Sequence, residues 1–387
     1  MSQASAALAA LSSTRSRTAP SSVLVPLTAD ELQVYRTASR NPLRDRKRKR
    51  EDDASDNSPG KLPDELSEPP TKRPRDAALV VQHYNARPDV GIVQRQQSPI
   101  VGLRYFNNWV KSVLIARFAH PALKSAGGGK VLDMGCGKGG DLNKWQKAKV
   151  KEYFGLDIAA VSVDQARSRY LSSRPNPSRM HQPPFSATFA TLDCYTSPLT
   201  AALPPHTLPP QAPPFDVVTM QFCMHYAFES ETKARCMLDN VSRWMRRGGV
   251  FVGTIPNDEL LLARLDALPP DQEELEFGNA VYKIRFDDRE HRPTYGHRYW
   301  FYLTDAVENV PEYVVYWDNF IKLAAEYDLH PLYKAEFHDV FAEHNEHNEF
   351  KPLLERMHVV DKNGESQMDE EQWEASNVYI GFAFEKR

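Results

Sequence analysis

A buried strand that runs directly into a glycine-rich turn constrains the fold of this chain more than any other feature. Residues 131–140 read VLDMGCGKGG, and residues 141–148 after them have helical character. Glycines in such a turn let the backbone approach a ligand closely, because they carry no Cβ. A strand, a glycine-rich turn and a helix in this order predict the first unit of a nucleotide-binding α/β sheet.

Segments with strand and helix character alternate through the rest of the chain. The expected strands are 130–134, 152–156, 189–192, 215–220 and 250–255. The expected helices are 100–118, 141–148, 160–172 and 230–247, the last closed by Gly248 and Gly249. This alternation predicts a Rossmann-like, doubly wound and mostly parallel sheet, with its ligand at the carboxyl edge of the strands.

Two further segments complete the expected architecture. A final strand at 377–385 should pair with residues 331–337. The proline-rich stretch 197–214 should form a surface loop between the third and fourth strands.

The glycine-rich turn fits three known kinds of nucleotide loop to different degrees. A Walker A loop requires Ser or Thr after its lysine, but Gly139 follows Lys138, so this interpretation fails. The dinucleotide fingerprint G-x-G-x-x-G is formally satisfied by residues 135–140. The D-x-G-x-G loop of Rossmann-like methyltransferases is also satisfied, because Asp133 precedes the first glycine.

Acidic residues end the next two expected strands. Asp157 ends the second strand and is placed to bind ribose hydroxyls under either nucleotide interpretation. Asp193 ends the third strand, where methyltransferases hold an adenine ring. Three acids at three successive strand ends support a nucleotide-like ligand better than the glycines alone.

Around this core the chain resembles the eukaryotic mRNA cap guanine-N7 methyltransferases. The resemblance runs from about Val80 to Lys386 in the family's order. Its matching runs are residues 83–85, 103–104, 106–109, 111–112, 133–142, 157–159, 161–163, 221–222, 225–226, 228–229, 256–257, 277–279, 310–312 and 382–386. The tail and the proline-rich stretch have no counterpart in it.

The resemblance implies a role for each of fourteen residues. Those implied to bind S-adenosylmethionine are Lys111, Gly135, Asp157, Asp193, Gln221 and Tyr226. Those implied to bind the cap are Asn107, Asn108, Lys138, Lys144, Arg169, His225, Glu312 and Tyr379. Among the cap residues, the lysines and the arginine should face the triphosphate, while His225 and Glu312 read the guanine edge and Tyr379 stacks on the base.

Each assignment has a plainer alternative. Asn107 and Lys111 lie four residues apart, so both can belong to the solvated face of a helix. Lys144 and Arg169 lie on expected helices, where exposed charge is the rule. His225, Tyr226 and Tyr379 can be ordinary packing residues.

The implied reaction asks little of the side chains. Guanine N7 carries a free lone pair at neutral pH and the sulfonium methyl is already activated, so we expect in-line displacement without a protein general base. Proximity and orientation, which can contribute about 7–11 kcal/mol, should suffice. No catalytic side chain and no metal ion are implied, and the four cysteines show no zinc-like or disulfide spacing.

Three alternative functions remain open from the sequence. The chain can be a methyltransferase for another RNA or for a small molecule, or a catalytically silent RNA-binding scaffold. The weakest alternative is a dehydrogenase.

The N-terminal region differs in composition from the rest. Residues 1–78 carry 14 basic and 11 acidic side chains, which leaves 34 of the 48 basic and 40 of the 51 acidic residues for the remainder. Low hydrophobicity predicts a disordered tail at 1–78, followed by the catalytic domain at 79–387. Its basic clusters at 44–50 and 72–75 suggest nuclear import, RNA binding or both. A mitochondrial presequence is a weaker interpretation.

The slightly acidic body means that any RNA must bind in a local basic groove. The partner expected from the resemblance is the 5′ end of capped mRNA, in the nucleus. The capping guanylyltransferase and the phosphorylated tail of RNA polymerase II are further candidates, and no segment is apolar enough to predict a membrane span.

Overall fold

A computed structural model describes residues 76–86, 96–172 and 185–387. The basic clusters of the expected tail, and most of that tail, lie outside these ranges. The first described element is helix α3 (Asp76–Ala86), so the expected boundary at residue 78 falls within its first turn.

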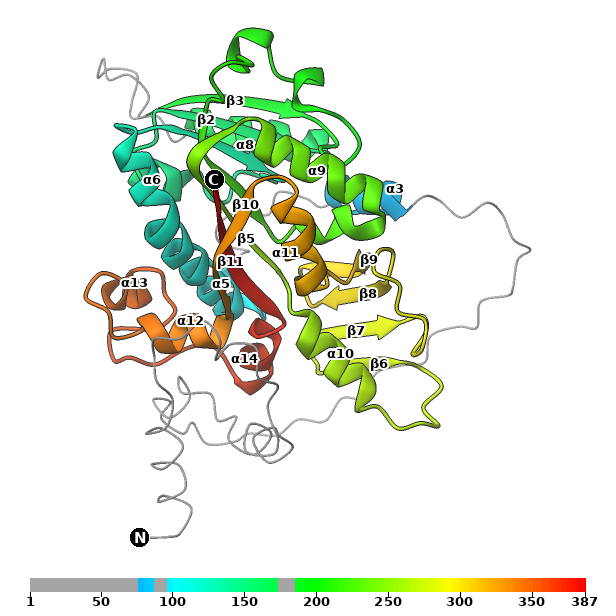
Figure 1. Ribbon diagram of the computed structural model, residues 1–387. Helices are drawn as coiled ribbons and strands as arrows, with labels where there is room; N and C mark the ends of the chain where they lie inside the picture. Colours follow the sequence, from blue (N-terminus) through cyan, green and yellow to red (C-terminus); the bar gives the residue numbers. More distant parts are fainter. Residues whose placement is uncertain (1–75, 87–95, 173–184) are drawn as a thin grey trace, which may run out of the picture. The chain divides into compact units, whose positions relative to one another are not determined.

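The core is a seven-stranded sheet in the order β10-β11-β5-β4-β1-β2-β3. Its parallel strands are β1 (Lys130–Met134), β2 (Glu152–Asp157), β3 (Ser186–Thr191), β4 (Phe215–Gln221) and β5 (Met245–Pro256). Strand β11 (Tyr379–Lys386) is antiparallel to both β5 and β10 (Leu329–Glu336), between which it lies (Figure 1). The expected Rossmann-like sheet and the pairing of its last strand are therefore confirmed.

Helices cover both faces of this sheet because alternate strand residues are apolar on each side. One face packs against α5 (Val101–Leu114), α7 (Leu142–Lys147), α8 (Ala160–Ser172) and α12 (Phe337–His344). The other packs against α9 (Glu231–Arg243) and α11 (Trp317–Ala325). The expected helix at 100–118 continues without a break through η2 (Ile115–Ala119) into α6 (His120–Ser125).

A second, four-stranded antiparallel sheet follows β5 and the helix α10 (Asp258–Asp266). Its strands, in spatial order, are β6 (Glu276–Gly278), β7 (Tyr282–Phe286), β8 (Arg298–Leu303) and β9 (Val307–Tyr313). Short helices α13 (Lys351–Arg356) and α14 (Glu370–Ser376) precede the last strand. The second sheet matters for the site because α3 packs on β9.

The expected helix at 230–247 is too long. It ends at Arg243, and Met245 already pairs with Phe215 at the start of β4. The Phe215 N–H donates to the Trp244 carbonyl at 3.0 Å, so the sheet takes the backbone that a longer helix would need. Gly248 therefore lies within β5, with a φ of 70°, and does not cap the helix.

The proline-rich stretch is more than a surface loop. It forms two short 3-10 turns, η3 (Leu199–Ala201) and η4 (Pro205–Thr207). Leu199, Leu203 and Leu208 are buried against the face covered by α9. Asn240 of α9 fixes the start of the stretch, because its Oδ1 accepts the Leu199 N–H at 3.0 Å.

Candidate functional site

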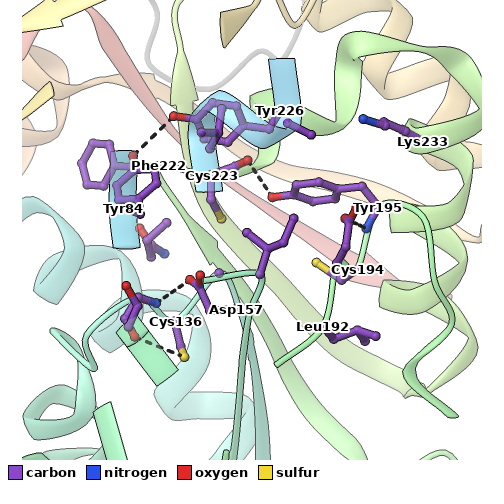
Figure 2. Close-up of a pocket in the computed structure, with 18 of the residues that line it drawn as sticks. Tyr84, Cys136, Asp157, Leu192, Cys194, Tyr195, Phe222, Cys223, Tyr226 and Lys233 are labelled. Atoms are coloured by element: carbon purple, nitrogen blue, oxygen red, sulfur yellow. Dashed lines mark hydrogen bonds between the residues drawn. The ribbon is translucent and has the colours of Figure 1, made fainter. Parts of the chain in front are cut away.

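A cavity of about 320 Å³ opens at the carboxyl edge of β1, β2 and β4 (Figure 2). A doubly wound sheet places its ligand at this edge. The cavity is lined by all six residues implied to bind the methyl donor: Lys111, Gly135, Asp157, Asp193, Gln221 and Tyr226. The structure therefore brings these six together, as expected from the resemblance.

The glycine loop forms one wall because its glycines adopt a conformation that other residues rarely reach. Gly135 has a φ of 80°, and a Cβ there would lie 2.5 Å from the Cys223 sulfur. The N–H groups of Gly135 and Cys136 both donate to the Leu156 carbonyl, at 2.7 and 2.9 Å. These bonds fold the loop back over the end of β2, and the Cys223 side chain leaves no room for a side chain at Gly135.

Asp157 ties the end of β2 to the glycine loop. Its Oδ2 accepts the Gly137 N–H and its Oδ1 accepts the Ala159 N–H, both at 2.8 Å. Burial raises the pKa of the Asp157 carboxyl, while these two backbone bonds oppose the rise. A carboxylate has about four acceptor positions, so two remain for ligand hydroxyls.

Two lysines share one buried carboxylate beside the cavity. Asp141 accepts Lys111 Nζ at 2.9 Å and Lys144 Nζ at 2.6 Å, one on each oxygen. Although burial alone raises it, these ammonium groups hold the pKa of Asp141 well below its usual range. Lys144 also donates to Asn108 Oδ1 at 3.0 Å, so α5 and α7 are joined through this network.

A second buried carboxylate lies behind the loop and behaves differently. Asp133 accepts the Tyr153 hydroxyl at 2.7 Å. Burial, together with the negative charge of Asp141, raises the pKa of Asp133 to about 7. Asp133 does not line the cavity, so it supports the loop and does not face a ligand.

The end of β4 carries an unusual backbone conformation. Phe222 has a φ of 59°, which for a bulky residue costs roughly 1–3 kcal/mol and is found mainly at functional sites. The Thr254 hydroxyl holds it by accepting the Phe222 N–H at 2.9 Å. The turn directs the Phe222 ring into the cavity, within 5.7 Å of Lys111 Nζ and 4.8 Å of the Tyr379 ring.

A chain of hydroxyl groups connects the cavity to Glu312. Tyr226 lies 3.3 Å from the Tyr84 hydroxyl of α3 and 3.4 Å from Glu312 Oε1 (Figure 2 shows the tyrosine pair). Glu312 Oε2 accepts the Tyr299 hydroxyl at 2.7 Å. His225 Nε2 lies 3.3 Å from Glu312 Oε1, but neither nitrogen of this ring meets hydrogen-bond geometry with another described residue.

The remaining residues implied to bind the cap differ in how closely they approach the cavity. Tyr379 is buried and contacts the cavity wall through Phe222. Asn108 of α5 accepts Lys144 Nζ at 3.0 Å, Asn107 precedes it in the same helix, and Lys138 lies in the glycine loop itself. Arg169 lies seven residues after Ser162, which lines the cavity, and is therefore about 10 Å further along α8.

Several lining residues were not expected from the sequence. Asp76 and Tyr84 reach the cavity because α3 packs over it, and Asp76 accepts the Tyr313 hydroxyl at 2.7 Å. Tyr84 belonged to a matching run, so that signal was present. Asp141 also lay in a matching run, but its role between two lysines depends on the position of α5.

The described ranges contain neither a candidate metal site nor a candidate membrane-spanning helix. Residues 76–86, 96–172 and 185–387 contain no cluster of three or more His, Cys, Asp or Glu placed to hold a metal ion. Across the same ranges no helix has the length and apolar character needed to cross a bilayer.

Comparison with known proteins identifies close relatives. Residues 71–387 match the family profile described as mRNA (guanine-N(7))-methyltransferase domain. A Cryptococcus neoformans var. neoformans serotype D protein named mRNA cap guanine-N(7) methyltransferase is 54% identical over 312 residues, which cover 81% of this chain and 48% of that protein. A Schizosaccharomyces pombe protein of the same name is 47% identical over 317 residues, covering 80% and 82%.

The chain is also similar to a plant protein. Its similarity does not cover the full length of every relative. An Oryza sativa subsp. japonica protein named mRNA cap guanine-N(7) methyltransferase 1 is 38% identical over 320 residues, covering 80% of this chain and 82% of that protein. The chain spans about half the length of the two Cryptococcus relatives, at 48% and 42%.

Proposed function

This chain belongs to the mRNA (guanine-N(7))-methyltransferase family, and we propose that it transfers a methyl group from S-adenosylmethionine to N7 of the guanine in the 5′ cap of RNA. The cavity at the carboxyl edge of the sheet is the proposed donor site. The adjoining region, which contains α5 and the buried side chains of Glu312 and Tyr379, is the proposed cap site.

One observation carries this proposal most directly: three of the assigned residues hold buried polar atoms that lack a partner in the described part of the chain. They are Asn107 Oδ1, Gln221 Oε1 and His225 Nδ1. Leaving such an atom unpaired costs roughly 1–3 kcal/mol, so native proteins rarely do so without a reason. Ligands that fill the cavity and the adjoining proposed cap site would supply the missing hydrogen-bond partners.

The donor site suits a nucleoside with a charged amino-acid arm. Asp157 offers two free acceptor positions to ribose hydroxyls, and the loop backbone at Gly135 can approach closely. Gln221 Oε1 is an acceptor available for the donor's ammonium group, and its Nε2 is held by Thr219 at 3.0 Å. S-adenosylmethionine supplies an activated sulfonium methyl when bound.

The cap side has the groups that distinguish guanine from adenine. A carboxylate accepts hydrogen bonds from the guanine N1 and N2 donors, which adenine does not present together. Tyr226 and Tyr299 hold the Glu312 carboxylate in place while leaving acceptor positions open. The Tyr379 ring packs edge to face against Phe222 and is the proposed stacking partner of the base.

The positive charges around Asp141 suit the triphosphate bridge. Lys144 is held by Asp141 and Asn108, and the Lys138 loop lies just before α7. Burial lowers the pKa of Lys144, while the neighbouring Asp141 carboxylate opposes this effect. Pre-positioned ammonium groups of this kind bind phosphates without a large loss of side-chain freedom.

The reaction then needs orientation more than acid–base chemistry. The side chains have to align guanine N7 with the methyl group and exclude water, because the nucleophile already has its lone pair. Holding two reactants in line is worth about 7–11 kcal/mol. No described residue is required to accept a proton.

The proposal is tested by methyl transfer from labelled S-adenosylmethionine to GpppA-capped RNA, with ApppA-capped and uncapped RNA as controls. We expect transfer to the guanine cap alone, with the label at N7. Equal transfer to uncapped RNA, or none to the guanine cap, would contradict it.

We further propose that the protein is located in the nucleus and associates with other proteins of the capping machinery. The basic clusters at 44–50 and 72–75 support import, and the guanylyltransferase and phosphorylated polymerase tail are the proposed partners. Fusion of residues 1–78 to a fluorescent protein tests the first. Co-purification of the full chain with each partner tests the second.

A further inference from the structure

The segment from α6 to β2 is strongly basic, although the chain as a whole is slightly acidic. Residues 121–151 contain seven lysines and two aspartates, while the whole chain has a net charge of −3. Both aspartates, Asp133 and Asp141, are buried, and Asp141 is paired with two ammonium groups. The positive charge of this segment is therefore not balanced by an exposed acid within it.

Four of these lysines are exposed to solvent. They are Lys124, Lys147, Lys149 and Lys151, and none of them forms an ion pair with another residue in the described ranges. The remaining lysine of this edge, Lys130, is paired with Glu152 at 2.9 Å. We refer to the four exposed lysines as the lysine track.

The parallel pairing of β1 and β2 brings the track together. Lys130 pairs with Glu152, so the turn before β1 and the turn before β2 both lie at the amino edge of the sheet, opposite to the carboxyl edge where the cavity opens. The Lys151 N–H donates to the carbonyls of Gly128 and Gly129, at 3.2 and 3.1 Å. A Cβ on Gly127 would lie 3.7 Å from Lys151 Nζ, which places that ammonium beside the end of α6, where Lys124 lies.

Helix α7 connects the track to the proposed cap site. It begins just after the glycine loop, which lines the cavity, and its six residues span about 9 Å. Lys144 lies on α7 beside Asp141, and Lys147 is one turn further on. The charge of Lys147 is close enough to act on Lys144.

We infer that the lysine track binds the RNA chain that follows the capped nucleotide. The inference rests on the proposed function, because Lys147, at one end of the track, lies one helical turn from Lys144, which is assigned to the cap phosphates. Ammonium groups that follow a path without base-reading groups bind single-stranded RNA through its phosphates, independently of sequence and with strong salt dependence. The track should therefore increase affinity for long capped RNA and leave the cap reaction itself unchanged.

The test variant replaces three track lysines: Lys124→Ala, Lys147→Ala and Lys151→Ala together. Lys149 is kept, because its φ of 57° makes the backbone sensitive to substitution. A matched control removes three exposed cations from α13 and the turn after it: Lys351→Ala, Arg356→Ala and Lys362→Ala. Both variants lose the same net charge.

Each protein is assayed on the cap dinucleotide GpppA and on an unstructured GpppA-capped RNA of about 20 nucleotides. We expect the track variant to match the unmodified protein on the dinucleotide, and to show a KM about tenfold higher on the long RNA at low salt. The slope of log affinity against log salt should fall by about 2, since each phosphate contact on a single strand contributes about 0.7. The control variant should behave like the unmodified protein on both substrates.

Binding of uncapped 20-nucleotide RNA, measured by fluorescence anisotropy, separates this inference from the proposed function. Absence of methyl transfer to the dinucleotide by the unmodified protein contradicts the proposed function but leaves this binding measurement valid. Equal losses on both capped substrates, or unchanged RNA affinity of the track variant, would overturn the inference. A third outcome would also overturn it. If the unmodified protein binds a phosphoserine peptide, and the track variant no longer binds this peptide but keeps its RNA affinity, the track serves a protein partner.

Discussion

The Asp157 carboxylate accepts the Gly137 N–H at 2.8 Å, and this bond joins the end of β2 to the glycine loop. The same carboxylate is proposed to bind ribose hydroxyls, so Asp157 shapes the proposed donor site and would also contact the donor. A change at this position should therefore affect donor binding in two ways.

Replacing Asp157 with alanine should weaken S-adenosylmethionine binding by about 10- to 100-fold, since hydrogen bonds to charged groups contribute about 1.5–3 kcal/mol. Methylation should fall accordingly, while circular dichroism shows an intact fold. Isothermal calorimetry measures the affinity. Asp164→Ala, on the exposed face of α8, is the control, and unchanged donor affinity in Asp157→Ala would remove this residue from the site.

Glu312→Gln should sharply reduce cap methylation while leaving donor binding nearly unchanged. It keeps the volume but replaces one acceptor oxygen by a donor, which cannot pair with the guanine N1 and N2 donors. A site that loses its designed hydrogen bonds can lose discrimination by about 10⁴-fold. The measurement is kcat/KM on GpppA-capped RNA.

Tyr299→Phe separates guanine reading by Glu312 from the positioning of its carboxylate. This variant removes the hydroxyl that holds Glu312 Oε2 at 2.7 Å but keeps the carboxylate. It should lose less activity than Glu312→Gln. Near-normal kcat/KM for Glu312→Gln would leave guanine recognition to His225 and Tyr379.

Tyr379→Ala should raise KM for the cap by about 5- to 100-fold, because stacking of a base on an aromatic ring contributes about 1–3 kcal/mol. Tyr379→Phe retains the ring and should retain most of the activity. The ring also packs against Phe222, so thermal melting of both variants is needed. Equal losses in the two variants would show that the hydroxyl, and not stacking, is what matters.

The two buried aspartates near the glycine loop, Asp133 and Asp141, should respond to pH in opposite directions. Burial raises the pKa of Asp133 to about 7, so its contribution to stability is present at low pH and is lost as the pH rises from its usual pKa to about 7. Asp133→Asn should therefore raise the melting temperature relative to the unmodified protein at pH 8, with a smaller gain near pH 4.

Asp141→Asn is the opposite case. Its pKa is held down by Lys111 and Lys144, so its stabilising contribution is present above its usual pKa and is lost on acidification. This variant should melt at a lower temperature at pH 7, with a smaller difference at pH 3–4. Melting curves across this range check both variants, and shifts of the same sign would contradict the assignment of the two charges.

A chain that lacks residues 1–70 should methylate a capped dinucleotide as well as the full chain does. It should lose nuclear accumulation, affinity for RNA or both, because the basic cluster at 44–50 is removed and only the cluster at 72–75 remains. A chain that lacks residues 1–78 also loses Asp76, which contacts Arg298 and Tyr313. Its donor affinity should be lower, and Asp76→Ala in the full chain should reproduce that loss. Failure of the first truncated chain on the dinucleotide would place the tail within the active unit.

The parallel core follows from local patterns in the sequence, and so does the meeting of several polar residues at one edge of the sheet. The bounds of β1 and α8 agree with expectation because their signals are local: a short apolar run before the glycines, and a helical segment between two strands. Parallel strands end at one edge, so Asp157, Asp193 and Gln221 had to converge there.

Other features of the fold depend on contacts between residues that are far apart in the sequence. The end of α9 was misplaced because Met245 pairs with Phe215, a partner 30 residues away that the local pattern of the helix does not reveal. The packing of α3 over the cavity likewise depends on Asp76 reaching Arg298, more than 200 residues later. Side-chain patterns specify a local period, whereas the register and docking of distant segments are set by the packing of the whole chain.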